Sequence, residues 1–110
     1  MPAKFELKKA KGEQFVFNLK APNGEIILTS EMYTTKTGAK NGIESVRRNV
    51  SLSVRFERKT AKTGKSFFVL KAANHQIIGK SEMYNSKEAM ENGIKSVMRN
   101  ALGAKLSELI

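Results

Sequence analysis

Lysine and arginine are the residues in this sequence whose chemistry points most directly to a ligand, because their cationic side chains bind phosphate. The chain contains 20 Lys and Arg against 10 acidic residues, a formal net charge of +10. Residues 4–20 carry a net charge of +3 and residues 55–71 a net charge of +5. Because most of the excess charge lies in these two segments, we interpret it as a surface for nucleic acid or another anionic partner rather than as a means of solubility alone.

The candidate residues are expected to gather on one face of a β-sheet. A side-chain period of two places Lys20 and Lys71 on the face opposite the core. A basic sheet face with an exposed aromatic ring can bind nucleic acid through phosphate contacts and base stacking. No RNP signature, GXXG loop or helix-turn-helix pattern is apparent, so the binding should have little sequence specificity. The candidates are Lys8, Lys20, Arg58, Lys59 and Lys71 for phosphate contact and Phe67 for stacking.

The sequence offers little for catalysis or for a metal centre. It contains no cysteine, and all its acidic residues are glutamates, which excludes thiolate ligands, thiol nucleophiles and Ser-His-Asp triads. His75, the single histidine, falls in a predicted turn, and we interpret it as a turn residue. Two glutamates could still act as acid and base, but no motif places them, and no phosphate-binding glycine loop occurs. We predict a protein that is not an enzyme and has no cofactor or metal.

The sequence consists of two similar halves. Residues 5–50 align with residues 56–101 without a gap, and 24 of the 46 aligned pairs are identical. This repeat indicates two copies of one supersecondary unit, and a chain of 110 residues corresponds to a single domain, residues 1–110. We assign residues 4–50 to repeat one, residues 55–101 to repeat two and residues 102–110 to a C-terminal tail that is frayed or lightly docked.

Each repeat is predicted to form three strands followed by a helix, which places the protein in the α+β class. Alternating apolar and polar residues indicate the strands, and apolar residues at helical spacing indicate the helix. Two such units can pair their edge strands about a pseudo-twofold axis, giving one curved antiparallel sheet of about six strands with both helices on one face. These elements are expected over residues 5–8, 15–21, 26–28 and 36–49 in repeat one, and the second helix over residues 87–100.

The same patterns predict several local features. The period of two places Phe17 and Leu19 in the core, but it does not decide which isoleucine of the third strand is buried. Thr35 is expected to cap the first helix and Ser86 the second. Glycine in mid-helix costs roughly 1 kcal/mol relative to alanine. Because Gly42 and Gly93 occupy equivalent mid-helix positions in the two predicted helices, we predict that another backbone approaches each helix closely there.

Three motifs occur in both repeats: Ser-Glu-Met-Tyr at residues 30–33 and 81–84, Asn-Gly-Ile-x-Ser-Val at 41–46 and 92–97, and Leu-Lys-Ala-x-Asn at 19–23 and 70–74. With these motifs the chain closely resembles the YegP-like family of small bacterial proteins over about residues 4–101. The resemblance implies tandem β-β-β-α repeats that form one curved sheet, and it implies no activity, cofactor or site residue. We interpret the Ser-Glu-Met-Tyr segments as structural corners; the alternative is a symmetric pair of binding sites at the repeat junction.

Together these patterns predict a small basic protein that binds nucleic acid through its basic hairpins. The alternative is a protein-interaction or structural module that uses an open sheet edge or an exposed sheet face, with Val16, Val54 or Phe67 exposed. The lack of cysteine and of an apolar leader leads us to expect a cytoplasmic protein without a membrane segment. Because the repeat is already internal, a monomer is compatible with the sequence, and the expected partner is nucleic acid or another protein.

Overall fold

The computed structural model describes residues 3–109 of the chain. The two long helices are α1 (Lys36–Asn49) and α2 (Lys87–Asn100), which have the predicted bounds. Short 3-10 turns lie at Lys11–Glu13 and Ser53–Arg55. The strands are β1 (Lys4–Ala10), β2 (Gln14–Lys20), β3 (Ile26–Ser30), β4 (Phe56–Thr60), β5 (Ser66–Lys71), β6 (Ile77–Lys80) and β7 (Lys105–Glu108).

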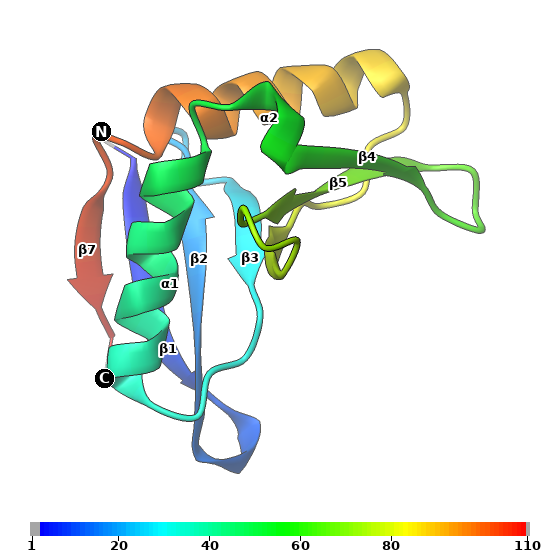
Figure 1. The fold of residues 1–110 in the computed structure, drawn as a ribbon. Coiled ribbons are helices and arrows are strands. Elements are labelled where there is room, and N and C mark those ends of the chain that lie inside the picture. Colours follow the sequence, from blue (N-terminus) through cyan, green and yellow to red (C-terminus); the bar gives the residue numbers. More distant parts are fainter. Residues whose placement is uncertain (1–2, 110) are drawn as a thin grey trace.

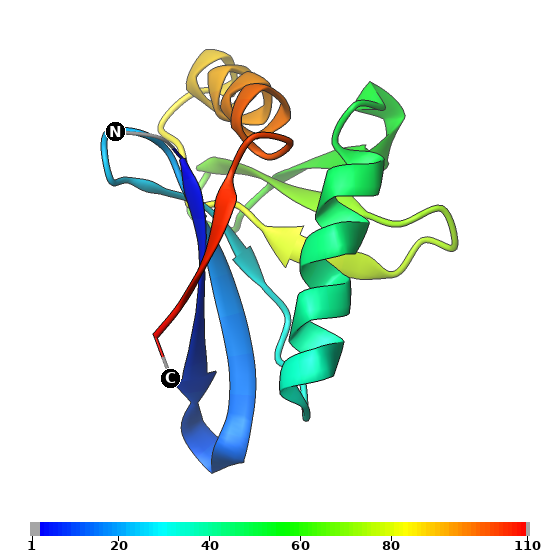
Figure 2. The same ribbon diagram turned by 90° about the vertical axis from the view of Figure 1, so that its left-hand side faces the viewer.

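All seven strands form one sheet, in the order β4-β5-β6-β3-β2-β1-β7. The two repeats join through β3 and β6, where Thr29 pairs with Lys80 and Ser30 with Gly79. Figures 1 and 2 show the two halves of the sheet at a steep angle to each other, with both helices on the same side. The predicted fold, one sheet of two β-β-β-α repeats with the helices on one face, is confirmed.

The C-terminal tail, predicted to be frayed or lightly docked, forms a seventh strand on β1. β7 runs parallel to β1, so the sheet is mixed rather than wholly antiparallel. The backbone N–H of Leu109 donates to the carbonyl of Leu7 (2.8 Å), and Glu108 forms ion pairs with Lys36 and Lys40 of α1. A four-residue strand whose partner lies at the other end of the chain leaves little local signal, which explains why the pattern did not reveal it.

The core lies between the helices and the covered face of the sheet. Phe17 and Leu19 are fully buried, as predicted, and so are their equivalents Phe68 and Leu70. Thr35 caps α1 by accepting a hydrogen bond from Gly38 N (2.9 Å), and Ser86 caps α2 in the same way. The apolar stripes that α1 and α2, each with its C-cap residue, contribute to the core are Ala39, Ile43, Val46 and Val50, and Met90, Ile94, Val97 and Ala101.

A β-bulge decides which isoleucine of the third strand is buried. The register between β2 and β3 shifts after Leu19, so that Lys20 pairs with Ile26 while Leu19 pairs with Leu28. The extra residue, Ile27, then joins the core and is 6% exposed. The same bulge between β5 and β6 buries Ile78 and leaves Ile77 40% exposed.

The Ser-Glu-Met-Tyr segments complete the sheet where β3 and β6 end. The hydroxyl of Ser30 accepts a hydrogen bond from Phe17 N (2.9 Å) and donates to the carbonyl of Glu31 (2.8 Å). Tyr33 then returns to the sheet and pairs its backbone with Phe15. Ser81 and Tyr84 make the equivalent contacts in repeat two. These contacts agree with the interpretation of the segments as structural corners.

The mid-helix glycines correct one prediction. The group that approaches Gly42 is the side chain of Tyr33, and the group that approaches Gly93 is the side chain of Tyr84, not another backbone. Each tyrosine ring also stacks on a core phenylalanine, Phe17 in the first repeat, with 6.1 Å between ring centroids. The glycine and tyrosine of the two repeated motifs therefore belong to one packing unit.

A candidate nucleic-acid interface on the helix-free face of the sheet

The outer face, which we define as the face of the sheet not covered by helices, carries most of the candidate lysines. Side chains alternate along a strand, so the neighbours of the buried core residues point to this face. β1 to β6 contribute two acidic residues to it, Glu6 and Glu57. The lysines on the same face are Lys4, Lys8, Lys20, Lys59, Lys71 and Lys80.

Each repeat holds one glutamate between two lysines on this face. Glu6, only 8% exposed, accepts from Lys20 (2.9 Å) and Lys4 (3.1 Å). The hydrogen bond from Lys20 does most to hold the pKa of Glu6 below its ordinary value, against the opposing effect of burial. We call this arrangement and its equivalent in repeat two the Lys–Glu–Lys clusters.

The second Lys–Glu–Lys cluster consists of Glu57 with Lys71 and Lys59. The hydrogen bond from Lys71, followed by that from Lys59, lowers the pKa of Glu57. Both carboxylates are therefore ionised at neutral pH, and each cluster keeps one positive charge in excess. Three predicted phosphate ligands, Lys20, Lys59 and Lys71, are therefore already paired with a glutamate in the free protein.

The sheet register keeps the two clusters apart. Lys20 pairs with Ile26 at the start of β3, whereas Lys71 pairs with Ile77, beyond the other end of β3. In a flat sheet this register would separate the two lysines by about 25 Å. They share the outer face, as expected, but they lie at opposite ends of it.

Lys80 occupies the middle of the outer face, between the two clusters. It lies on β6 opposite Thr29 of β3, at the junction of the repeats. Its Nζ lies 5.2 Å from the centre of the Phe67 ring, a distance typical of a cation–π contact. The half-buried Phe67 is therefore covered by a cation, and a base could stack on it only after Lys80 moves. The sequence search missed Lys80 because its equivalent in repeat one is Thr29.

Lys8 is the one predicted phosphate ligand that lies exposed on the outer face and forms no ion pair among residues 3–109. It lies on β1 opposite Val16 of β2. Val16 is 5% exposed, which corrects the expectation of an exposed side chain at this position. Val54, by contrast, is 84% exposed, as that expectation required.

Arg58 does not lie on the outer face and is a further correction. Its guanidinium reaches the helix side of the sheet, where Nη2 donates to Glu91 Oε1 of α2 (3.0 Å) and Nε pairs with the other oxygen of the same carboxylate. The alternation of side chains along a strand explains this position. Arg58 aligns with Leu7, which is fully buried on the core side of β1.

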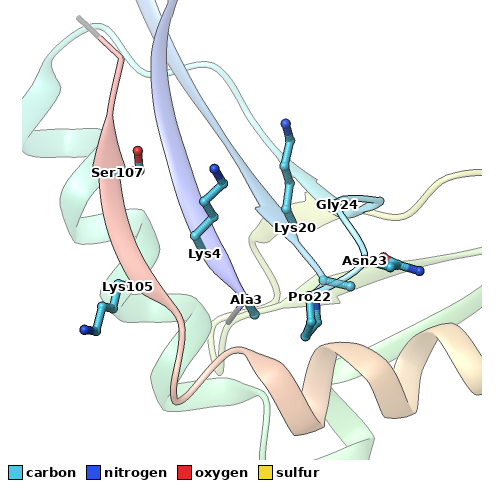
Figure 3. Close-up of a pocket in the computed structure, with 9 residues that line it drawn as sticks. Ala3, Lys4, Lys20, Pro22, Asn23, Gly24, Lys105 and Ser107 are labelled. Carbon is cyan, nitrogen blue, oxygen red and sulfur yellow. The ribbon is translucent and has the colours of Figure 1, made fainter. Parts of the chain in front are cut away.

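A hollow of about 390 Å³ lies at the end of the outer face beside β1 and β7. Figure 3 shows Lys4 and Lys20 pointing to the same side of the sheet, while Lys105 points away from them. The floor is apolar, with Ala3, Ala21 and Pro22. An equivalent hollow of about 280 Å³ in repeat two is lined by residues that include Arg55, Lys71 and His75. Both hollows border a Lys–Glu–Lys cluster and extend the basic surface.

The remaining candidates for chemistry have structural partners. The hydroxyl of Ser30 is used by the sheet, and burial raises the pKa of Tyr33. His75 lies in the turn between β5 and β6 with φ of 70°. In the part of the chain that the structure describes, no three His or Glu side chains gather as metal ligands would. Neither described helix has the length and apolar character needed to cross a lipid bilayer.

Comparison with known proteins shows that the chain is similar to small proteins from bacteria. A family model described as "Domain of unknown function (DUF1508)" matches it twice, over residues 10–57 and 61–108. Each match begins at or just after the end of the first strand of a repeat, β1 or β4, and ends in the strand that follows the helix, β4 or β7. A UPF0339 protein of Shewanella oneidensis is 55% identical over 105 residues, which cover 96% of either chain. The UPF0339 protein YegP of Escherichia coli (strain K12) is 58% identical over 96 residues, which cover 87% of either chain.

Two solved structures have the same fold. A solution NMR structure of a UPF0339 protein from Shewanella oneidensis superposes with a TM-score of 0.92 at 54% sequence identity, covering 99% of this chain and 92% of that one. The solution NMR structure of YegP from E. coli superposes with a TM-score of 0.93 at 52% identity, covering 99% of this chain and 94% of that one.

Proposed function

Because the chain belongs to the DUF1508 family, whose description names no ligand, we propose a function from its surface: the protein binds nucleic acid, without catalysis, through the outer face of the sheet. Family membership confirms the resemblance to YegP-like proteins. The observation that carries the proposal is the charge balance of the outer face, where six lysines accompany two glutamates. Neither described helix covers this face, and exposed lysines on it can meet an extended polyanion.

The geometry supports contacts to phosphate rather than to bases. Lysine is a flexible point charge that suits phosphate without fixing base identity. Lys8 and Lys80 offer ammonium groups that no described carboxylate holds. Lys20 forms an ion pair with Glu6, and Lys71 forms one with Glu57. A phosphate bound to either lysine would compete with that carboxylate for the ammonium group. Release of Phe67 by Lys80 would add a stacking surface for a base.

Fluorescence anisotropy with labelled single-stranded and duplex RNA and DNA, from about 50 to about 200 mM salt, tests the proposal. The informative variant is Lys8→Gln with Lys80→Gln, because neither lysine stabilises a buried carboxylate. It should bind more weakly, and the log–log salt slope should fall by about one for each lost phosphate contact. Lys20 and Lys71 are poorer choices, since their loss would leave Glu6 and Glu57 with one partner each.

The matched control is Arg48→Gln with Arg99→Gln, which removes the same charge from exposed positions on α1 and α2. This control should bind nearly as well as the original protein. Equal weakening by the two double variants would show general charge attraction instead of a defined face. Absence of binding to all four nucleic acids at about 50 mM salt would reject the proposal.

A further inference from the structure

The outer sides of β1 and β4 are equivalent under the repeat, but among the described strands only the side of β1 is covered. β1 and β4 are the first strands of their repeats, and each pairs with the next strand of its hairpin. β7 lies against the free side of β1, with Lys105 opposite Lys4 and Glu108 opposite Leu7. β4 ends the sheet, and no described strand lies beside it. An edge of this kind presents backbone N–H and C=O groups that can pair with another strand.

β7 shows what such an edge accepts. Its backbone is held by the hydrogen bond from Leu109 N to Leu7 O (2.8 Å). Its carboxylate, Glu108, bridges Lys36 and Lys40 on the helix above. The incoming strand is therefore parallel, and it brings an acidic side chain to a basic helix.

The β4 edge carries part of this surface without the strand. Arg58 stands where Leu7 stands in β1, and its Nη1 donates to the carbonyl of Phe56 (3.3 Å), a group of the edge itself. Lys87 is the equivalent of Lys36, whereas the equivalent of Lys40 is Glu91, whose carboxylate pairs with Arg58. At the start of the edge, the Nε of Arg55 is a buried side-chain nitrogen for which no described residue provides an acceptor. Such a group is costly to leave unpaired.

Hollows flank the β4 edge on both faces. The one on the helix side has a volume of about 270 Å³ and includes Arg58, Lys87 and Glu91 in its lining. The one on the outer face, about 280 Å³, includes Arg55, Glu57 and Lys71. Basic side chains outnumber acidic ones on both sides, so a strand that entered here would meet positive charge above and below it.

We propose that the β4 edge binds an extended acidic segment of a partner protein, which adds to the sheet as a strand parallel to β4. The backbone of the segment pairs with the Phe56 and Arg58 positions, as β7 pairs with β1. An acidic side chain at the position of Glu108 in β7 bonds Lys87 and draws Arg58 away from the Phe56 carbonyl. Arg58 thus covers the edge of the free protein and becomes a ligand of the bound strand.

The test is an NMR titration of the labelled protein with a blocked heptapeptide that has the sequence of residues 103–109, with Lys105 replaced by Glu. Amide shifts should be confined to β4 and the residues that line its flanking hollows. Two control peptides separate the contributions: one carries Lys in place of both Glu residues, and the other is N-methylated at alternate backbone nitrogens, which removes donors but keeps the charges. Neither should produce these shifts at concentrations up to about 1 mM.

A pair of protein variants adds a test of position. Lys87→Glu should lower the affinity for the acidic peptide about three- to tenfold. Lys95→Glu, at an exposed position of the same helix, should change this affinity little. Shifts spread over all basic residues, or equal binding of the N-methylated peptide, would show charge attraction without strand addition and overturn the proposal. Absence of binding at about 1 mM would also overturn it. Shifts of the β4 amides that depend on protein concentration alone would identify a second copy of the chain as the occupant instead.

Discussion

Tyr33 occupies the space that a side chain at Gly42 would fill. A Cβ placed on Gly42 would lie 2.6 Å from the ring carbon Cζ of Tyr33 and closer still to its hydroxyl oxygen. The same relationship joins Gly93 and Tyr84, again with 2.6 Å to Cζ. Glycine has a lower helix propensity than alanine, but it leaves room for the tyrosine of the strand-to-helix corner to pack against the helix. The same arrangement occurs in both repeats.

The first prediction is that Gly42→Ala destabilises the protein by about 1–3 kcal/mol, as overpacking of a filled site does, although alanine is the better helix former. Urea denaturation followed by circular dichroism measures the change. Gly103→Ala is the control, because an added Cβ there would meet no atom within 4 Å. A more stable Gly42→Ala protein would contradict the packing described here. Combining it with Tyr33→Phe, which removes the nearest atom, should cost less than the sum of the single changes.

A second prediction concerns the hydroxyl that completes the sheet. Ser30→Ala leaves the buried N–H of Phe17 without its acceptor, so the free energy of unfolding should fall by about 1–3 kcal/mol. Hydrogen exchange at Phe17 should become faster than in the original protein. Ser51→Ala, at an exposed position, should leave both quantities nearly unchanged. If the Phe17 amide stays equally protected in Ser30→Ala, another acceptor has replaced the hydroxyl.

The Lys–Glu–Lys clusters predict how stability depends on acid. The folded protein lowers the pKa of Glu6 and Glu57, so below the ordinary carboxyl pKa the unfolded chain binds more protons than the folded one. Stability from these groups is therefore present above the ordinary value of 4.5 and is lost as the pH falls through the lowered folded values. Unfolding free energies measured from about pH 6 to about pH 3 should decline, and Glu6→Gln with Glu57→Gln should decline less. Carboxyl NMR titration midpoints at or above 4.5 would contradict this account.

The turn at His75 offers a stabilising change. Gly24 has φ of 86° in the first repeat, and His75 has φ of 70° at the equivalent position. The left-handed conformation is costly for residues other than glycine. His75→Gly should therefore raise the free energy of unfolding by about 0.5–1 kcal/mol, measured by urea denaturation. The converse change, Gly24→His, should lower it. A less stable His75→Gly protein, or a more stable Gly24→His protein, would contradict the turn geometry.

The fold could be predicted because the sequence contains two copies of the same β-β-β-α unit. Periodicity located both helices, and the repeat showed that one sheet must serve two units. β7 could not be found in the same way, since its pairing with β1 depends on a contact between the two ends of the chain. The bulge that buries Ile27 also has no counterpart in a strict period of two.

The candidate site was predicted less well than the fold, for identifiable reasons. A search by equivalence between repeats cannot find Lys80, because Thr29 stands in its place. Arg58 could have been placed correctly, since it aligns with the apolar Leu7. The partners of Lys20 and Lys71 depend on strand register, because Glu6 lies on β1, one strand away from Lys20.

The position of β7 beside β1 means that the path of the chain nearly closes on itself. α1 leads into β4, the outer strand of the second hairpin, and α2 leads into β7, which lies beside β1, the outer strand of the first. Because Lys105 lies opposite Lys4 on a neighbouring strand, about 5 Å away, Ala104 could continue directly into β1. The molecule therefore has the topology of a ring with one cut. New ends could be opened in the exposed turn at residues 61–65, and a circularly permuted chain would traverse the same two units starting from a different strand.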